Sequence, residues 1–394
     1  MRKLWEQLAI ATNWPVLVAV AILSAIGVLS IWVSDPLGTA GMKQLAFLCV
    51  SFVCMMLFQA VNYQQIGRWS WPFYFFSMGL VAYTLVGAKV HSLPFVHETK
   101  GVYAWINFGP MSLEPGELMK IAFVMVLARY LRFRSNYRTM KGLFAPFAVA
   151  LVPVAMIMKQ PDLGMASLFV PTLFAMLFVA GARIKHLILV ALMGVAVVPL
   201  LWFCGDKPEG PGIPVLKHMP VFIKAYQRQR VFSMFKNDPR TLRESAYQTQ
   251  RALTAFASGG LTGKGAAVIP IGAHVPEAHN DMIFALVGEQ FGLVGAAVVL
   301  GAFLVLFAAG TEIASGTREP FGRLIAVGIV SMLAAQTFVN LMVMLRLMPV
   351  TGITLPFVSY GGSSLVSSFM AVGLLLNVGQ NRPLVIAREA FDFE

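Results

Sequence analysis

The sequence predicts an all-α polytopic membrane protein with about ten transmembrane helices. Of its 394 residues, 58% are hydrophobic and only 12% are charged. Apolar stretches long enough to cross the hydrocarbon core recur from one end of the chain to the other. A soluble domain does not need so much apolar surface. We therefore expect residues 1–394 to form a single integral membrane domain.

Length and interruption by charged residues place the individual spans. The first stretch is too long for a cleavable signal and lacks a small-residue cleavage site, so it is expected to remain as a helix. The expected helices centre on Trp14–Trp32, Leu45–Val61, Trp71–Val86, Pro115–Leu131, Leu143–Met158, Leu163–Gly181, His186–Cys204, Asp281–Ala309, Leu324–Leu345 and Leu355–Val378.

Short basic loops predict the orientation of the chain. Basic residues precede the first span, cluster after the fourth, sixth and eighth, and follow the last one. With this helix count they all lie on one side, and cytoplasmic loops carry the excess of Lys and Arg. We therefore expect both termini in the cytoplasm. The residues concerned are Arg2, Lys3, Arg129, Arg132, Arg134, Arg138, Lys141, Arg183, Lys185, Arg318, Arg323, Arg382 and Arg388.

Two larger loops then lie on the extracytoplasmic side, roughly residues 89–114 and 205–280. The second, between the seventh and eighth helices, is far longer than an ordinary connection. It holds ten basic residues against five acidic ones. Two interpretations remain open: a solvated surface against anionic lipid, or a cradle for a phosphate-bearing lipid substrate. The tract from Val221 to Phe256 could form helices that lie along the membrane interface.

Composition also excludes some classes of function. The formal net charge is +12. In a membrane protein basic residues set orientation and meet anionic headgroups or substrates, so no nucleic-acid partner is expected. The three cysteines, Cys49, Cys54 and Cys204, lie in or at the end of apolar stretches. They have neither disulfide nor metal-site spacing and are interpreted as small hydrophobic residues.

The segment from Val275 to Asp281 is the strongest candidate site. It is polar, contains acids, and runs directly into a long apolar stretch. Asp281 has two interpretations: an N-cap of the following helix, or a general base, partly desolvated at the membrane boundary and backed by Glu277 or His279. Glu289, two turns further on, is either a structural helix partner or a second site residue.

Two further segments place charge beside apolar stretches. Glu117 and Lys120 are three residues apart on one helix face and could pair. This pair either fixes the start of the helix or lines a polar cavity inside the bundle. Asp162 follows a proline in a tight polar hairpin, where capping of the next helix is the simpler interpretation.

Basic and hydroxyl residues complete the set of candidates. Arg228 and Arg230 could bind a pyrophosphate, since arginine forks suit phosphate oxygens, or could be surface residues. The loop Ser258–Gly265 resembles an anion-binding loop but lacks the spacing of a nucleotide P-loop. Near the end, Ser359 and Ser363 belong to a stretch rich in Pro, Gly and hydroxyl residues. This stretch indicates irregular backbone that lines a cavity, or close packing of small residues.

Taken in order, these segments closely resemble the SEDS family, the polytopic RodA/FtsW/SpoVE proteins of bacterial wall synthesis. The resemblance covers nearly the whole chain, and the joint order of the motifs is highly specific. The motifs are Trp105-Ile106, Gly109-Pro110, Glu114-Pro115-Gly116-Glu117 with Lys120, Lys159-Gln160-Pro161-Asp162-Leu163-Gly164, Tyr226-Gln227-Arg228-Gln229-Arg230, Ser258-Gly259-Gly260, Pro276-Glu277-Ala278-His279-Asn280-Asp281 and Pro356-Phe357-Val358-Ser359-Tyr360-Gly361-Gly362-Ser363-Ser364.

The resemblance implies a peptidoglycan glycosyltransferase of the bacterial cytoplasmic membrane that polymerises lipid II at its outer face. It implies that Asp281 is the essential aspartate. Divalent metal dependence, on Mg²⁺ or Mn²⁺, and a class B penicillin-binding protein as partner transpeptidase are also implied. The loop Ser258–Gly265 and the short termini favour the elongation-type branch, RodA, working with elongation-complex membrane proteins, over the division-type branch, FtsW.

The chain departs from the family pattern at four positions. The family usually has arginine at the position of Ala104 and serine at the position of Gly116. It favours glycine at the positions of Met342 and Arg346. Arg346 would lie on the outer side and could add a phosphate contact.

Two functions of other classes remain open. In a lipid flippase or transporter, Glu117, Lys120 and the segment Ser359–Ser364 would line a translocation path. A scaffold would only position a partner enzyme, and loss of the Asp281 carboxylate would then be silent.

Overall fold

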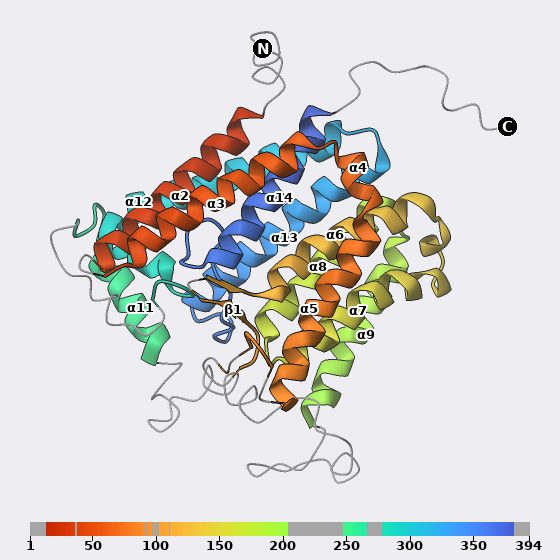
Figure 1. Ribbon diagram of the computed structural model, residues 1–394, viewed down its shortest axis with the longest axis horizontal. Helices are drawn as coiled ribbons and strands as arrows, with labels where there is room; N and C mark the ends of the chain where they lie inside the picture. Colours follow the sequence, from red (N-terminus) through yellow and green to blue (C-terminus); the bar gives the residue numbers. More distant parts are fainter. Residues whose placement is uncertain are drawn as a thin grey trace.

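A computed structural model describes residues 13–35, 38–90, 93–96, 98, 102–109, 111–203, 247–265 and 278–381. In this part of the chain, long helices form one bundle in which α2 begins at the end where α14 finishes (Figure 1). They are α2 (Trp14–Ser34), α3 (Ala40–Ala60), α5 (Ser70–Val90), α6 (Pro115–Phe133), α7 (Phe144–Lys159), α8 (Leu163–Ala180), α9 (Ile184–Phe203), α12 (Ile283–Gly316), α13 (Pro320–Met344) and α14 (Gly362–Gln380).

The predicted fold class is confirmed. Eight of these helices are long and apolar enough to cross a membrane. The other two are α6, which carries ionisable residues, and α9, whose apolar part is shorter. Large apolar side chains stay exposed on outward faces, for example Leu192, Val195 and Leu304. Such a surface suits contact with lipid.

Most helix ends lie within a few residues of the prediction, but the last helix begins later than expected. The sequence predicted a helix centred on Leu355–Val378, whereas α14 begins only at Gly362. Phe357 has a φ of 65°, a left-handed conformation that no α-helix continues through. The backbone before α14 is therefore irregular, as the Pro- and Gly-rich stretch indicated.

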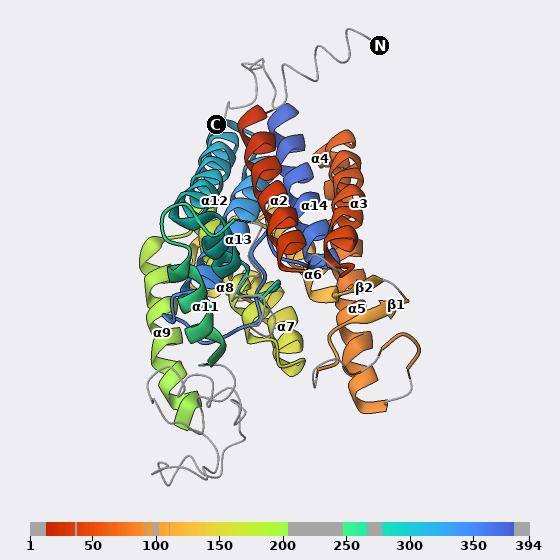
Figure 2. The ribbon, with the colours of Figure 1, turned by 90° about the vertical axis from the view of Figure 1, so that its left-hand side faces the viewer.

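Several short elements were not predicted. The helix α4 (Tyr63–Arg68) joins α3 to α5, and the strands β1 (Ile106–Phe108) and β2 (Met111–Leu113) form an antiparallel hairpin before α6. Short elements of this kind carry little periodic signal. The hairpin lies at the opposite end of the bundle from α4 (Figure 2).

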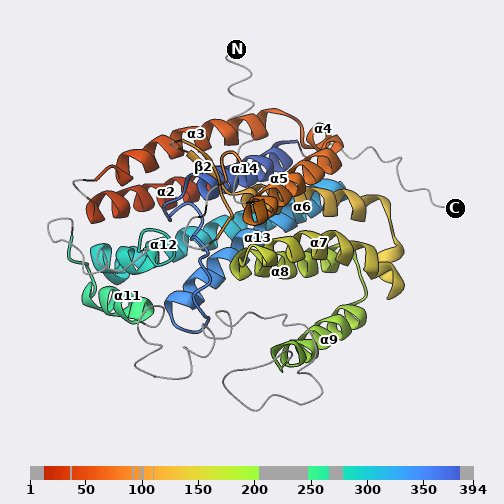
Figure 3. The ribbon, with the colours of Figure 1, turned by 60° about the horizontal axis from the view of Figure 1, so that its bottom comes forward.

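One amphipathic helix of the long loop is described. The helix α11 (Tyr247–Ser258) falls at the end of the tract predicted to contain interfacial helices. It packs against α12 and touches α13 (Figures 2 and 3). The rest of that tract lies outside the described residues, as do Cys204 and the basic residues of the two termini.

The unusual Arg346 has a backbone explanation. Its φ is 59°, in the region that costs most residues about 1–2 kcal/mol and glycine nothing. Glycine, which the resemblance led us to expect at this position, would therefore suit the turn after α13 better than arginine does.

Candidate functional site

Asp281 lies in a turn before α12 and is half-buried. The helix itself starts at Ile283, and its N-cap position is Met282, whose side chain makes no capping hydrogen bond. The interpretation of Asp281 as an N-cap is therefore wrong, because the helix begins one residue too late for that carboxylate to occupy the cap. A Cβ placed on Gly352 would lie 3.9 Å from Asp281 Oδ2, so this carboxylate faces the loop after α13.

The backbone around Asp281 is held from a distant part of the chain. Three consecutive carbonyls, those of residues 279–281, each accept a hydrogen bond from a residue of α13 or of the irregular segment before α14. The donors are, in order, Tyr360 N at 2.8 Å, Ser359 Oγ at 2.6 Å and Asn340 Nδ2 at 2.9 Å. A turn with every carbonyl bonded in this way is fixed in position. Ser359 is thus a support of the Asp281 turn.

His279 contributes a fourth attachment on the other side. Its Nδ1 lies 3.1 Å from Ser34 Oγ at the end of α2. The Asp281 turn is consequently held between α2 and the segment that precedes α14. Whether His279 also contacts substrate stays a prediction.

A buried ion pair lies in α6. Glu117 Oε2 is 2.9 Å from Lys120 Nζ, and the two side chains are only 4% and 3% exposed. The predicted pairing is confirmed. Ser367 donates a hydrogen bond to Glu117, and Lys120 donates one to Gln336 Oε1 at 2.8 Å. Buried charges need such partners, since an unpaired one costs several kcal/mol.

Hydrogen bonds continue from this pair towards Asp281. Gln336 Nε2 donates to the Thr354 carbonyl at 3.0 Å, and one residue earlier the Ile353 carbonyl accepts from Asn340 Nδ2 at 2.7 Å. The same Asn340 amide bonds the Asp281 carbonyl. The residues Thr351–Tyr360 therefore join the ion pair and the Asp281 turn, and we call them the linking segment.

The remaining predicted site residues surround the linking segment. Asp162 Oδ1 accepts from Met165 N at 2.8 Å and caps α8, so the capping interpretation is confirmed. Ser363 Oγ donates to the Ser112 carbonyl at 2.6 Å and accepts from Glu114 N at 3.0 Å, which ties α14 to the β hairpin.

Glu114, just before α6, is electrostatically unusual. Although part of the residue reaches the surface, burial of its carboxyl raises its pKa well above the usual range. The nearby Glu117 and Asp162 carboxylates raise this pKa further, while Lys120 and a hydrogen bond with Trp105 oppose the rise. Three acids and one lysine thus share one region at this end of the bundle.

Some predicted residues cannot be placed. Arg228, Arg230 and Glu277 lie outside the described residues. In the described part of the chain, no group of three or more His, Cys, Asp or Glu side chains could hold a metal ion. The described side chains around Asp281 therefore do not by themselves form a metal site, and the divalent metal stays a prediction.

Sequence reasoning missed the amides that organise the site. Asn340 and Gln336 are each 1% exposed and lie on α13, one turn apart. Polar side chains inside apolar helices are costly unless they form hydrogen bonds. The presence of two amides within this apolar stretch was therefore the signal in the sequence that could have identified them. Their partners lie in the linking segment, which no local periodicity reveals.

The fold and site define a polytopic membrane protein with an acidic, hydrogen-bonded centre at one end of its bundle. The sequence model of the FtsW/RodA/SpoVE family of cell cycle proteins matches residues 5–383. The chain belongs to this family.

Relatives and solved structures agree with this assignment. The chain is 34% identical to stage V sporulation protein E of Bacillus subtilis, over 86% of each chain. It is 32% identical to a probable peptidoglycan glycosyltransferase FtsW of Trichlorobacter lovleyi, over 85% of this chain and 82% of that one.

Among solved structures, a peptidoglycan synthase complex that coordinates polymerization and crosslinking contains a chain with a TM-score of 0.76 and 29% identity, covering 95% of this chain and 99% of that chain. The rod shape determining protein RodA of Thermus thermophilus has a TM-score of 0.66 and 26% identity, covering 94% and 97%.

Proposed function

We propose that this protein is a peptidoglycan glycosyltransferase that polymerises lipid II, with Asp281 as general base. The observation that carries the proposal is the fixed turn around Asp281: a half-buried carboxylate just before the apolar helix α12, with its backbone held by Tyr360, Ser359 and Asn340. A base must be held in position and partly desolvated to accept a proton efficiently. Family membership supports the assignment.

The proposed reaction is an inverting glycosyl transfer. The 4-hydroxyl of an acceptor sugar attacks the anomeric carbon of a second lipid-linked disaccharide, a new C–O bond forms, and the bond to the polyprenyl pyrophosphate breaks. Asp281 takes the hydroxyl proton, because this hydroxyl is too weak an acid to react unassisted. The leaving pyrophosphate needs positive charge, a role we predict for Arg228 and Arg230.

The decisive experiment is polymerisation of lipid II by purified protein in detergent. Asp281→Asn is expected to lower the rate at least about 10²-fold, as loss of a general base does, with the melting temperature unchanged. Glu312→Gln, an exposed acid far along α12, is the matched control and should retain the parental rate. A parental rate in Asp281→Asn would refute the base assignment and fit a scaffold role.

The same assay separates the enzyme from a transporter, since polymer formed without a bilayer cannot come from transport. The geometry of the ion pair also bears on this alternative. Glu117 and Lys120 are enclosed and bonded at both ends. This arrangement supports a structural role for the pair more than a path for a lipid, and contact of the pair with substrate stays a prediction.

The branch of the family is a separate proposal. The loop Ser258–Gly265 favours elongation, with a class B penicillin-binding protein and elongation-complex membrane proteins as partners and both termini in the cytoplasm. The names of the curated relatives quoted above, SpoVE and FtsW, point to sporulation and division instead. Complementation of an elongation-deficient and of a division-deficient strain distinguishes these: rescue of rod shape alone supports elongation, and rescue of septation alone refutes it.

A further inference from the structure

The helix α12 is broken close to the Asp281 turn. Gly292 has φ 66° and ψ −163°, so the helix divides into a short half, residues 283–291, and a long half, residues 293–316. Such a break leaves the carbonyls before it and the N–H groups after it without helical partners. Residues 283–290 are all buried, so the carbonyls before the break must find other partners.

One loop supplies four such partners. We call residues Ser258–Gly265 the clasp loop. Its N–H groups bond the carbonyls before the break, and its carbonyls accept from the N–H groups after it. The pairs are Lys264 N to Glu289 O at 2.9 Å, Gly265 N to Gln290 O at 3.0 Å, Leu293 N to Gly260 O at 2.9 Å and Val294 N to Leu261 O at 3.2 Å. The glycine-rich loop therefore binds protein backbone.

The glycines permit this close approach. A Cβ on Gly263, whose φ is +82°, would lie 2.2 Å from the Gln290 carbonyl oxygen, and one on Gly292 would lie 2.4 Å from Gly263 N. A Cβ on Gly259 would lie 2.0 Å from the Gly288 oxygen. The two backbones touch, and no larger residue fits at these positions without movement.

A charge pair closes the contact, with Glu289 buried and Lys264 partly exposed. Lys264 Nζ lies 2.6 Å from Glu289 Oε1, and the Glu289 side chain is 1% exposed. Ser258 Oγ lies 3.5 Å from the same oxygen, and the rings of Phe256 and Phe284 stack with centroids 5.7 Å apart. Glu289, the second acid of the sequence, is thus bound to the clasp loop.

We infer that the clasp loop, closed by Lys264 and Glu289, fixes the direction of the short half of α12 and so positions the Asp281 carboxylate. Lys264 and Glu289 are then positioning residues. The inference rests on the proposed function, because it assigns the pair to the geometry of that same base. The clasp loop, which resembles an anion-binding loop in sequence, then supports the break in α12 and does not bind an anion.

The test compares Lys264→Met and Glu289→Gln with the parental protein. Each is expected to lower kcat for lipid II polymerisation roughly tenfold to a hundredfold, as displacement of a catalytic group does, with KM within about twofold. Lys264→Arg keeps the charge and should recover most of kcat. Glu312→Gln, on the long half of α12, is the matched control and should change nothing.

Hydrogen exchange gives a readout that does not depend on catalysis. In both variants the amides of residues 283–287 should exchange faster, while those of residues 296–306 keep their parental rates. Parental kcat together with parental exchange at 283–287 would overturn the inference. So would a loss of melting temperature with kcat and exchange unchanged.

The hydrogen-exchange measurement also distinguishes failure of this inference from failure of the proposed function. If the parental protein does not polymerise lipid II, the proposed function fails, yet faster exchange at residues 283–287 would still support the clasp. If Lys264→Met does not fold, Ser258→Ala removes the weaker contact to Glu289, together with the hydrogen bond that Ser258 Oγ donates to the Ala255 carbonyl. It should shift kcat and exchange in the same direction by a smaller factor, and no shift in either would refute the inference.

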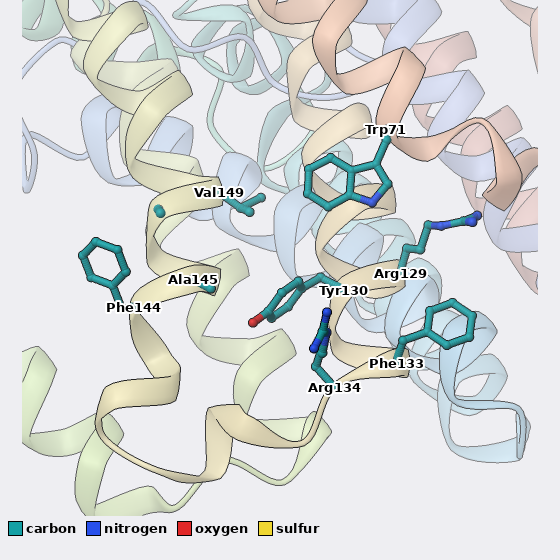
Figure 4. A pocket seen from close by; sticks show the side chains of 9 residues that line it. Trp71, Arg129, Tyr130, Phe133, Arg134, Phe144, Ala145 and Val149 are labelled. Atoms are coloured by element: carbon teal, nitrogen blue, oxygen red, sulfur yellow. The ribbon is translucent and has the colours of Figure 1, made fainter.

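A second inference comes from the opposite end of the bundle. A groove of about 460 Å³ lies between the ends of α5, α6 and α7 (Figure 4). Tyr130 and Arg134 stand together on one wall, and Phe144 and Val149 lie on the facing helix (Figure 4). Phe144 is 80% exposed. The groove thus has a basic, hydrogen-bonding side and an apolar side.

The charge at this groove is unbalanced. Arg134 is exposed and has no hydrogen bond or ion pair with any residue that the structure describes. Arg129 lies between this groove and a second one of about 440 Å³, which Arg68 and Arg132 also line. None of the residues found to line the two grooves is acidic. Among the residues that the structure describes, only Arg132 of these arginines has an acidic partner, Glu319 at 3.1 Å.

We propose that this groove binds one phospholipid with a net negative headgroup. The phosphate would lie against Arg134 and the Tyr130 hydroxyl, and an acyl chain would run along Trp71, Phe144 and Val149. Basic pockets between membrane helices bind anionic headgroups in this way, and guanidinium forks suit phosphate oxygens.

The test uses detergent-purified protein supplied with phosphatidylglycerol, with zwitterionic phosphatidylcholine, or with inorganic phosphate. Phosphatidylglycerol alone should raise the melting temperature by several degrees and be retained as one copy in native mass spectrometry, because a ligand stabilises the state it binds. Arg134→Gln should abolish both effects. Arg183→Gln, an exposed arginine at the same end, is the control and should retain both.

Equal effects of the two lipids would refute the proposal. An equal effect of inorganic phosphate would do so as well, since the site would then take the ion and not the lipid. Retained binding in Arg134→Gln would remove the groove as its location.

Discussion

The two ends of the bundle treat charge in opposite ways. At the Asp281 end, Glu117 and Lys120 are buried, paired and continued by hydrogen bonds to the linking segment. At the other end, arginines line open grooves, and the pair Arg132–Glu319 has side chains 34% and 15% exposed. A buried charge such as that of Glu117 or Lys120 is stable only where every partner is in place. The exposed arginines of the grooves can instead contact lipid. The acidic end therefore encloses its charges, whereas the basic end leaves them open to lipid.

The largest difference between the ends should appear when each ion pair is broken. Glu117→Gln leaves the Lys120 ammonium buried without its partner, and we expect the free energy of unfolding to fall by about 3–5 kcal/mol. The double variant Glu117→Met with Lys120→Met should recover much of this loss. Thermal unfolding in one fixed detergent measures both. A single variant as stable as the parental protein would contradict the buried-pair description.

A smaller effect is expected from the amide that links the two parts of the site. Asn340→Leu removes the donor for the Asp281 and Ile353 carbonyls. The free energy of unfolding should fall by about 1–3 kcal/mol for each carbonyl left without a hydrogen bond. Polymerisation should fall more steeply than stability, because the Asp281 turn loses an attachment. Asn340→Asp offers an oxygen in place of the amide and should not rescue it. Equal polymerisation by the parental protein and Asn340→Leu would show that this attachment is unnecessary.

Glu114 should make the acidic end sensitive to pH. Its pKa in the folded protein is raised, whereas an unfolded glutamate titrates near about 4.3. Between these two values the unfolded chain holds fewer protons, so stability falls as pH rises through the window. Glu114→Gln should flatten this slope and raise the melting temperature at neutral pH. Melting curves across pH 4–8 measure the slope, and an unchanged slope would assign it to another group.

The basic end should barely respond to the equivalent change. Arg132→Met removes a partly exposed pair, and such pairs contribute about 0–1 kcal/mol. The change in melting temperature should be small and should shrink further in high salt, because exposed charges are screened. A loss as large as that of Glu117→Gln would remove the distinction between the two ends.

Local chemistry was predictable from local sequence. Glu117 and Lys120 pair three residues apart on one helix, and Asp162 caps the helix that begins at the next residue. Both depend on backbone geometry that a helix sets by itself. The same capping rule does not hold for Asp281, because the N-cap position of α12 is Met282, one residue further along the chain. Its position depends on Ser359 and Asn340, which lie far away in the sequence.

The sequence by itself determined that the chain crosses a membrane many times, where most of its helices lie, and which acidic residues are candidates for the site. Apolar length and residue spacing within one helix carry that information. Only the tertiary structure decided that Glu289 pairs with Lys264 in the clasp loop, that α12 breaks at Gly292, and that three carbonyls hold the Asp281 turn. These contacts join residues from separate segments, and no local period encodes which distant partner a polar group will find.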